Sequence, residues 1–328
     1  MTQSADLAEA TIHTHTSRDA VTRHDFSRQR WHGFLWAGLS VLIFSGWFVV
    51  TRLSVTRELR LWDVTALRFG IGALVLSPVL LKDRKKIPAK AWIEGLVYAC
   101  LWGLPFVLAV AFGLQITSAR RAAAITPALM PVFAGVFAWI TLRESQGARR
   151  WGGYLAIIVG LTCLTLSGDS MNEKMSPLGL SALVVAAAMW ATYTLLFRRS
   201  ELTPVQSAAL ICFWSSAIFL PIYILGGFSL LAHASAQEII LQAVYQGLLM
   251  SGVAIVAFNR SVTLLGPSSA TAIIALIPAA ASLTAIPILG ERPNIAEGIA
   301  IACVVIGVLF VARSSRSTLT RTSSPPQG

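Results

Sequence analysis

The chain has 328 residues, of which 55% are hydrophobic and only 12% are charged, and its mean hydropathy is +0.69. Soluble domains carry about 25% charged residues, so this composition excludes an ordinary soluble protein and is typical of a membrane protein. The net charge of +11 comes from 26 basic and 15 acidic residues. Because the basic residues lie in short clusters between apolar stretches, they indicate membrane topology, and no nucleic acid is expected as a partner.

Ten apolar stretches follow a polar amino-terminal tail, and each is long enough to cross a lipid bilayer as a helix. The tail, residues 1–32, lacks the apolar run of a signal peptide, so we expect it to be retained, without regular structure. A second polar tail covers residues 313–328. The chain is therefore predicted to be an all-α, polytopic membrane protein with ten transmembrane helices. The predicted spans are 33–53, 61–81, 92–113, 116–140, 151–168, 177–197, 203–225, 238–258, 264–288 and 295–312.

The basic residues are distributed unequally between alternate loops. If the amino terminus is inside, the cytoplasmic segments hold 18 Lys and Arg and the opposite segments hold 6. Basic residues near span ends are retained in the cytoplasm, so both termini are predicted to be cytoplasmic, in a bacterial-type inner (plasma) membrane. Arg120 and Arg121, at the outer start of the fourth span, run against this pattern.

The two halves of the chain resemble each other. An offset of 147 residues pairs Gly160 with Gly307, and an offset of 143 near the front of each half pairs Trp47 with Trp190. Each half holds five spans, an odd number, so the second copy enters the membrane in the opposite orientation. Inverted repeats place a binding site near the bilayer midplane, where rocking of one half against the other alternates access. The predicted repeats are residues 33–168 and 177–312.

Four stretches carry a family resemblance when they are taken in order. They are SGWFVVTR (45–52), TALRFGIGALVL (65–76), TPALMPVFAGVFAWITLRE (126–144) and IIALIPAAASLTAIPILGE (273–291). With the duplication, they resemble the EamA family of the drug/metabolite transporter superfamily. The resemblance implies a transporter of ten helices in two inverted repeats around a central cavity. Such transporters move metabolites such as amino acids or their analogues, often by efflux. The chain departs from the family pattern at Arg120, Arg121 and Arg143.

The third and eighth predicted spans each carry aromatic, polar and small residues on one helical stripe. Positions 95, 98, 102, 105, 109 and 112 form the first stripe, and positions 242, 245, 249, 252, 256 and 259 form the second. Polar groups that face lipid are costly, so we expect these stripes to line a cavity, while packing between helices is the alternative. The substrate-binding candidates on them are Tyr98, Trp102, Tyr245 and Asn259.

Three further substrate-binding candidates lie deep within spans. Trp47 and Trp190 lie ~21 Å and ~20 Å into their spans, and they are interpreted as repeat-related walls or gates, or else as packing or lipid-facing residues. Arg68 lies about 10 Å inside the second span, where an ionisable residue is a functional candidate. It would pair with a substrate carboxylate, or else snorkel toward the headgroups or bond to Asp63.

Small residues recur on the fifth and tenth spans. They occupy positions 153, 156 and 160 in the first half and 300, 303 and 307 in the second. Such stripes let helix backbones approach closely, so these two spans are predicted to be scaffold helices. Stripes of this kind also permit a homodimer.

Other classes of function lack the residues that they require. The sequence contains no Gly-Lys dipeptide, hence no phosphate-binding loop, and neither HExxH nor GxSxG occurs. Its four cysteines lie singly in apolar stretches and its five histidines in polar segments, so we expect no metal, no cofactor and no enzyme. All fifteen acidic residues lie in tails, loops or near span ends, which favours facilitated diffusion or exchange over obligatory proton antiport.

The sequence thus predicts a secondary transporter, an exporter or exchanger of a small organic metabolite such as amino acids or related amphipathic compounds. One alternative is a carrier of nucleotide sugars or phosphorylated metabolites, for which only Arg68, Arg120 and Arg121 could supply charge. Another is a non-transporting membrane sensor or assembly subunit, which we would expect to carry an appended soluble domain.

Overall fold

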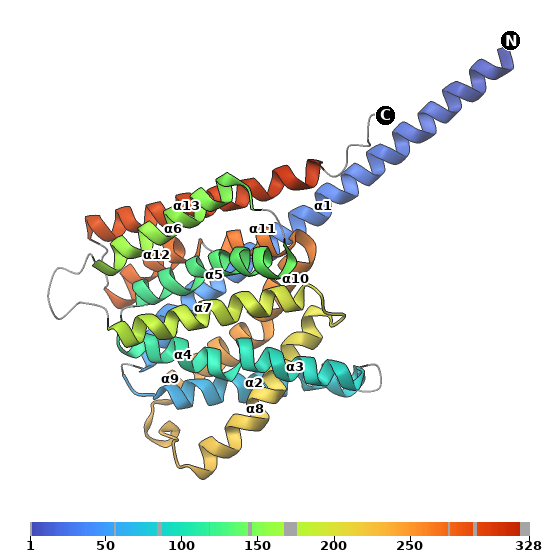
Figure 1. Ribbon diagram of the computed structural model, residues 1–328. Coiled ribbons are helices and arrows are strands. Elements are labelled where there is room, and N and C mark those ends of the chain that lie inside the picture. The colour runs from blue at the N-terminus through green and yellow to red at the C-terminus, as the bar shows by residue number, and fades with distance from the viewer. Residues whose placement is uncertain are drawn as a thin grey trace.

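The computed structural model is a bundle of helices, and no strand occurs in the part of the chain that it describes (Figure 1). That part comprises residues 2–55, 57–83, 87–117, 119–143, 146–166, 176–274, 276–290 and 294–321. The helices are α1 (Thr2–Val55), α2 (Leu61–Asp83), α3 (Ala89–Trp102), α4 (Leu104–Gln115), α5 (Ala119–Leu142), α6 (Ala148–Leu166), α7 (Pro177–Phe197), α8 (Pro204–Leu225), η2 (Leu231–His233), α9 (Ala236–Gln242), η3 (Ala243–Ala254), α10 (Ile255–Leu265), α11 (Pro267–Ile274), α12 (Ile277–Leu289) and α13 (Ile295–Arg321).

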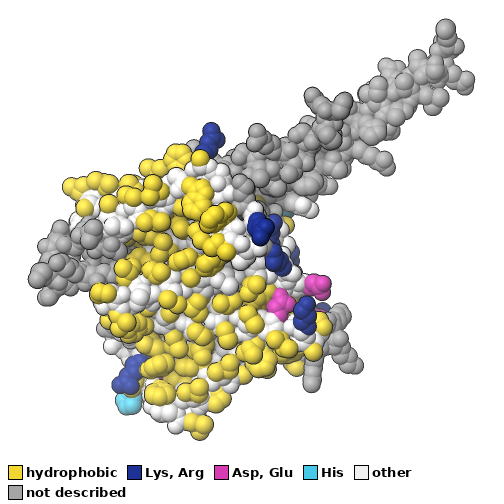
Figure 2. Space-filling model, viewed as in Figure 1, with side chains coloured by type: hydrophobic (Ala, Val, Ile, Leu, Met, Phe, Trp, Pro, Cys, Tyr) yellow, Lys and Arg dark blue, Asp and Glu magenta, His cyan; other side chains and the backbone are white. Residues whose placement is uncertain are grey.

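Seven helical segments within the described residues are long and apolar enough to cross a membrane, so the protein is an integral membrane protein. They are Gln29–Val55, Leu61–Asp83, Ala89–Gln115, Ala122–Thr141, Pro177–Phe197, Pro204–Leu225 and Ala236–Leu265, and the shorter apolar helices are Ile277–Ile288 and Ile295–Val311. Hydrophobic side chains cover most of the face seen in Figure 2, and the coloured charged groups lie toward its edges. An apolar exterior of this kind fits contact with lipid tails.

The amino-terminal tail differs from its expected form. Residues 2–32 are helical and continue directly into the first predicted span, because α1 begins at Thr2. The expectation of a tail without regular structure was therefore wrong. The physical reason is local: residues 2–32 contain neither Pro nor Gly, so no residue in them breaks a helix that the apolar span propagates backwards.

The contacts between helices repeat from one half of the chain to the other. Helix α2 packs on η3 as α8 packs on α3, and α1 packs on α10 as α7 packs on α4. Helix α5 packs on α7 as α12 packs on α1. The remaining large contacts join equivalent helices, namely α2 with α8, α5 with α12 and α6 with α13. The two halves thus interlock, and each contributes to the other's interior.

Helices α6 and α13 approach until their backbones touch. A Cβ atom on Gly153 would lie 2.7 Å from the Gly307 carbonyl oxygen, and one on Gly307 would lie 2.8 Å from the Gly153 carbonyl oxygen. About two turns further along α6, a Cβ atom on Gly160 would lie 2.9 Å from the Ala300 carbonyl oxygen. The predicted close approach is confirmed. Because the contact moves from 307 to 300 as α6 rises from 153 to 160, the two helices are antiparallel.

Repeat-related positions also end helices α5 and α12. Arg143 follows α5 with φ of 52°, and Gly290 follows α12 with φ of 69°. The two positions differ by the repeat offset of 147 residues. A left-handed residue closes many helices, and glycine adopts this conformation without the strain that a side chain brings. The departure from the family pattern at Arg143 thus lies at a helix end, where its side chain is exposed.

Polar contacts fasten α2 and α8 at both ends. At one end, Asp63 Oδ1 accepts hydrogen bonds from Tyr223 Oη at 2.6 Å and from the Leu230 backbone N–H at 2.9 Å. At the other end, Gln206 Nε2 donates to Asp83 Oδ2 at 2.9 Å. Since the start of each helix lies beside the end of the other, α2 and α8 are antiparallel.

A break at Gly103 divides the third predicted span into α3 and α4. The Leu104 N–H donates to Ser215 Oγ at 3.2 Å, and a Cβ on Gly103 would lie 2.3 Å from that oxygen. The break rotates the second part, so Pro105 is exposed and Phe106 is buried instead. The predicted stripe is therefore buried at positions 95, 98 and 102, and the burial is interrupted at position 105.

The eighth predicted span is wound as a π-helix over η3, Ala243–Ala254. Its hydrogen bonds run over five residues, so it turns less per residue than the α-helix that the stripe assumed. Gln242, Gln246, Met250 and Phe258, all spaced by multiples of four, are buried, whereas Tyr245 is half-buried. On this span the predicted stripe is fully buried only at its two ends, positions 242 and 259.

Candidate substrate-binding site

Eight side chains from both halves of the chain enclose a small space inside the bundle. The gaps between these side chains amount to about 210 Å³, but none of them has room for a water molecule, so the side chains must separate before a solute can enter. They are Phe44, Trp47, Phe48, Arg68, Trp102, Phe106, Trp190 and Met250, and we call this set the aromatic box. Each of the eight is at most 2% exposed, so the space is closed to both ends of the bundle. Helices α1 to α4 contribute six of the side chains, and α7 and η3 contribute Trp190 and Met250.

Ring contacts hold the walls of the aromatic box in place. Trp102 stacks on Tyr193 with 4.6 Å between ring centroids and on Trp190 with 5.5 Å. Phe44 meets Trp190 edge-on at 5.4 Å, and Trp47 stacks on Phe106 at 6.3 Å. The structure therefore brings together Trp47, Trp102 and Trp190, three of the residues singled out in the sequence. Offset and edge-on pairs of this kind stabilise a packed cluster.

Arg68 is the one charged member of the aromatic box, and its side chain is 1% exposed. Its Cζ lies 4.9 Å from the centroid of the Trp47 ring and 5.6 Å from that of Phe69. Nε and Nη1 have no hydrogen-bond partner among the described residues. Cation–π contact with two rings replaces only part of the hydration that such a buried guanidinium loses.

The alternative interpretations of Arg68 were wrong. Asp63 does not pair with it, because the Asp63 oxygens accept from Tyr223, from the Leu230 N–H and from the Arg60 N–H at 2.9 Å. Snorkelling toward headgroups would leave the guanidinium exposed, whereas it lies inside the bundle. Ser251 Oγ donates to the Arg68 carbonyl oxygen at 2.9 Å and thereby fixes this turn of α2 against η3.

The two repeat-related tryptophans use their indole N–H groups differently. Trp47 Nε1 donates to Gln246 Oε1 at 2.9 Å. Trp190 Nε1 is buried and has no partner among the residues that the structure describes. The aromatic box thus contains unpartnered donors from two side chains, Arg68 and Trp190, which line the same space.

A row of buried polar side chains leads from Trp47 to the start of α9. Gln246 Nε2 donates to Thr51 Oγ1 at 2.9 Å and to Gln242 Oε1 at 3.2 Å. Gln242 Nε2 in turn donates to Glu238 Oε1 at 3.3 Å, and Ser54 Oγ donates to the same carboxylate oxygen. We call Gln246, Gln242 and Glu238 the polar chain. It joins α1 to α9 and η3 on one side of the aromatic box.

Tyr98 and Asn259 lie beside the aromatic box on its other side. Both contact Tyr193, whose hydroxyl donates to Asn259 Oδ1 at 2.8 Å and whose ring meets Tyr98 edge-on at 5.1 Å. Tyr98 Oη donates to Glu94 Oε1. Glu94 lines a polar cavity with Lys90, Arg199, Glu201 and Gln206, at the end of the bundle where α3 and α8 begin. Tyr98 and Asn259 therefore contact Tyr193, which stacks on Trp102 of the aromatic box, and they do not line the enclosed space themselves.

Tyr245, like Tyr98 and Asn259, is not part of the aromatic box. Its hydroxyl donates to the Ile43 carbonyl oxygen at 2.9 Å and lies over Gly46, where a Cβ would be 2.0 Å from it. The missing side chain at Gly46 makes this contact with α1 possible. Tyr245 therefore fastens η3 to α1.

Sequence reasoning missed several residues of the site. Phe44 and Phe48 lie on one face of α1 at a spacing of four, and this spacing was a usable signal. Gln246, four residues after Gln242, was a second signal, because two amides on one face of an apolar span rarely face lipid. Phe106 and Met250 could not be found this way, since each follows a change of helical winding.

Other features of the sequence form no site in the structure. Among the described residues, no three His, Cys, Asp or Glu lie close enough together to hold a metal ion. The four cysteines are free thiols, and Cys212 is the buried one. The side chains of Arg120 and Arg121 lie outside the described residues.

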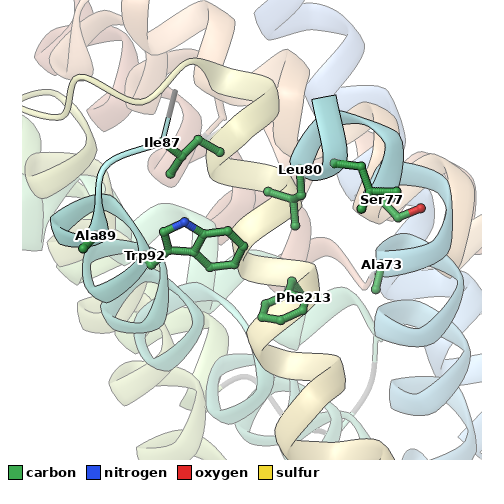
Figure 3. Close-up of a pocket in the computed structure, with 8 residues that line it drawn as sticks. Ala73, Ser77, Leu80, Ile87, Ala89, Trp92 and Phe213 are labelled. Atoms are coloured by element: carbon green, nitrogen blue, oxygen red, sulfur yellow. The ribbon is translucent and has the colours of Figure 1, made fainter. Parts of the chain in front are cut away.

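An open groove between α2, α3 and α8 is a second cavity, and Figure 3 shows its walls. Leu80, Ile87, Trp92 and Phe213 give it an apolar lining. Its one hydroxyl, Ser77 Oγ, donates to the Leu74 carbonyl oxygen at 2.8 Å. Since Ser77 and Trp92 carry the only polar side-chain atoms of this lining, the groove offers few groups that could orient a polar solute.

Comparison with known proteins supplies the context for this geometry. The profile of the EamA-like transporter family matches residues 31–166 and again residues 177–313. An uncharacterized transporter of Bacillus subtilis strain 168, YwfM, is 25% identical over 274 residues, which cover 79% of this chain and 88% of that one. An uncharacterized transporter of Clostridium kluyveri is 24% identical over 266 residues, 78% of this chain and 84% of that one.

A solved structure shares the fold. Its TM-score is 0.63 at 20% identity, and the match covers 91% of this chain and 99% of the solved chain. The sequence therefore predicted the family correctly, and the profile matches its two halves separately, as the internal repeat requires. The chain belongs to the EamA-like transporter family and is a membrane transporter.

Proposed function

We propose that the protein is a secondary transporter that carries a small organic metabolite, such as an amino acid or a related amphipathic compound, through the aromatic box by alternating access. The observation that carries the proposal is that the box is buried and assembled from both halves, with Trp47 and Arg68 from one and Trp190 and Met250 from the other. A site shared by two halves opens to either side when they rock against each other. Family membership implies a carrier and not an enzyme.

The proposed architecture is ten transmembrane helices in two inverted repeats. Each predicted span overlaps one helix or two or three consecutive helices, such as α6, the pair α11 and α12, and the run α9, η3 and α10. Support for inversion comes from α6 and α13, which are equivalent in the two halves yet antiparallel, as shown by Gly153, Gly160, Ala300 and Gly307. An odd number of spans in each half also requires that the second half has the opposite orientation in the membrane.

Two closures separate the aromatic box from the ends of the bundle. The Tyr98 and Glu94 pair with Tyr193 lies between the box and the polar cavity, and the polar chain lies on the opposite side. With both termini in the cytoplasm of a bacterial-type cell, as the loop charges favour, the Glu94 side is cytoplasmic and the Glu238 side is external. Export then requires Tyr98 to open first and the polar chain to open second.

Trp102→Ala tests the proposal. In liposomes loaded with a mixed pool of amino acids and related metabolites, the unsubstituted protein is expected to release one solute class selectively. Trp102→Ala should slow this release by about tenfold or more, because it removes the stacking of Trp102 on Tyr193 and Trp190. Trp31→Ala is the matched control, since Trp31 is 64% exposed and remote from the box, and it should transport normally. Equal rates for both variants would contradict the assignment of the site.

The absence of acidic residues among the described side chains that line the aromatic box supports facilitated diffusion or exchange. We therefore expect release to persist when a pH gradient alone is collapsed and the solute gradient is kept. The measurement is flux in the same liposomes with an ionophore that equalises pH. A rate that collapses with the pH gradient, and that becomes insensitive to pH in Glu238→Gln, would instead assign proton coupling to the polar chain.

A further inference from the structure

We infer that the aromatic box binds an organic anion, a flat apolar body bearing one carboxylate, in preference to a zwitterion or a dianion of the same size. The inference narrows the proposed substrate class to amphipathic compounds that carry a carboxylate without the ammonium group of an amino acid, and it rests on the proposed function only for the statement that the bound compound is carried across the membrane. It depends on Arg68, Trp190 and the composition of the walls around them.

The buried guanidinium is the first step of the argument. Arg68 is held by two aromatic rings at 4.9 and 5.6 Å, while its Nε and Nη1 lack hydrogen-bond partners among the described residues. A buried charge without a counterion is costly, and the cost is removed when an anion pairs with it. Guanidinium N–H groups lie in one plane and suit carboxylate oxygens. A carboxylate that enters as the rings separate would therefore satisfy a cation that has no hydrogen-bond partner at Nε and Nη1 among the described residues.

A second donor lines the same space. Trp190 Nε1 is fully buried and lacks a partner among the described residues, whereas its repeat-related counterpart Trp47 is engaged by Gln246. An indole N–H donates only, so a ligand meets it with an acceptor atom. The Arg68 guanidinium and the Trp190 indole N–H thus both need hydrogen-bond acceptors, which an anion provides.

The walls define what else the ligand carries. Apart from Arg68, every described lining residue is aromatic or methionine, which suits a flat apolar body. An ammonium group would find no carboxylate there, because the nearest acid of the polar chain, Glu238, is already bonded to Ser54 and Gln242. A doubly charged phosphate would retain one negative charge after pairing with a single guanidinium. One carboxylate and no ammonium match the site.

Three compounds of similar size test the inference: 3-phenylpropanoate, its neutral amide 3-phenylpropanamide and the zwitterion phenylalanine. Binding to the purified full-length protein is measured from the shift in its thermal unfolding midpoint during titration. The propanoate is expected to bind at least about tenfold more tightly than either of the others. Arg68→Gln should abolish this advantage, Arg68→Lys should retain part of it, and Arg57→Gln, which alters an exposed arginine, should leave it intact.

The outcomes separate the two proposals. Equal binding of propanoate and amide, binding of none of the three, or a propanoate preference that survives Arg68→Gln would each overturn the inference. Flux of the same compounds through liposomes is then measured. Selective propanoate binding without flux would contradict the transport proposal and leave the binding assignment intact, whereas flux that favours the amide or the zwitterion would uphold transport and overturn the anion assignment.

Discussion

Replacing Gly153 with leucine is expected to prevent the last helices of the two halves from packing. A Cβ at this position would lie 2.7 Å from both the Gly307 carbonyl oxygen and a Val311 methyl group, and the remaining leucine atoms have no room between two backbones. Overpacked interiors lose about 1–3 kcal/mol even where side chains can shift, and a backbone carbonyl cannot shift alone. We expect a loss at or above the top of that range, seen as a large drop in thermal unfolding midpoint and in folded yield.

Gly152 provides a matched control on the same turn of α6. A Cβ on Gly152 meets nothing within 4 Å, so Gly152→Leu adds the same atoms to the apolar exterior. Its unfolding midpoint should remain close to that of the unsubstituted protein. Similar midpoints for Gly152→Leu and Gly153→Leu would contradict the close antiparallel packing of α6 against α13.

Replacing Gln246 with leucine is expected to destabilise the protein by about 2 kcal/mol, since it leaves buried groups without partners. Gln246 exchanges hydrogen bonds with Trp47 Nε1, Thr51 Oγ1 and Gln242 Oε1. Leucine has similar size but neither accepts nor donates, so the Trp47 N–H would become an unpartnered donor inside the bundle. The measurement is the midpoint of thermal unfolding in detergent.

The control for this substitution is Gln115→Leu, which removes an exposed amide at the end of α4. It should leave the midpoint nearly unchanged. Hydrogen bonds between membrane helices are often worth less than 1 kcal/mol each, so a null result for Gln246→Leu would mean that Gln246 contributes packing alone. The polar chain would then not stabilise the closed side of the aromatic box.

The fold was largely predictable because its signals are strong and local. Long apolar runs require helices in lipid, and the small residues around Gly153 and Gly307 predict a close pair at the right positions. The tail was misjudged because polarity was taken as a sign of irregular structure. The break at Gly103 had a local signal that was missed, since Pro105 lies in the first turn of α4, a favoured place for proline. The π-helical winding of η3 was not predicted.

The candidate site was predictable in part for the same reason. Trp47 and Trp190 were found by their depth within spans, Trp102 by the stripe of aromatic and small residues on the third span, and Arg68 because a charge inside a span is costly. The sequence could not show that Arg68 contacts aromatic rings and not Asp63. The Asp63 carboxylate accepts hydrogen bonds from Tyr223 and from the Leu230 N–H, which belong to a distant part of the chain. Such competition is visible only in three dimensions.

The π-helical winding of η3 links two parts of the protein that are otherwise separate. Gln246, in the polar chain, and Met250, in the aromatic box, lie four residues apart on this segment. Rewinding η3 as an α-helix would rotate both side chains relative to α1 in a single movement. A change in the winding of η3 would therefore move a wall residue of the aromatic box and a member of the polar chain together.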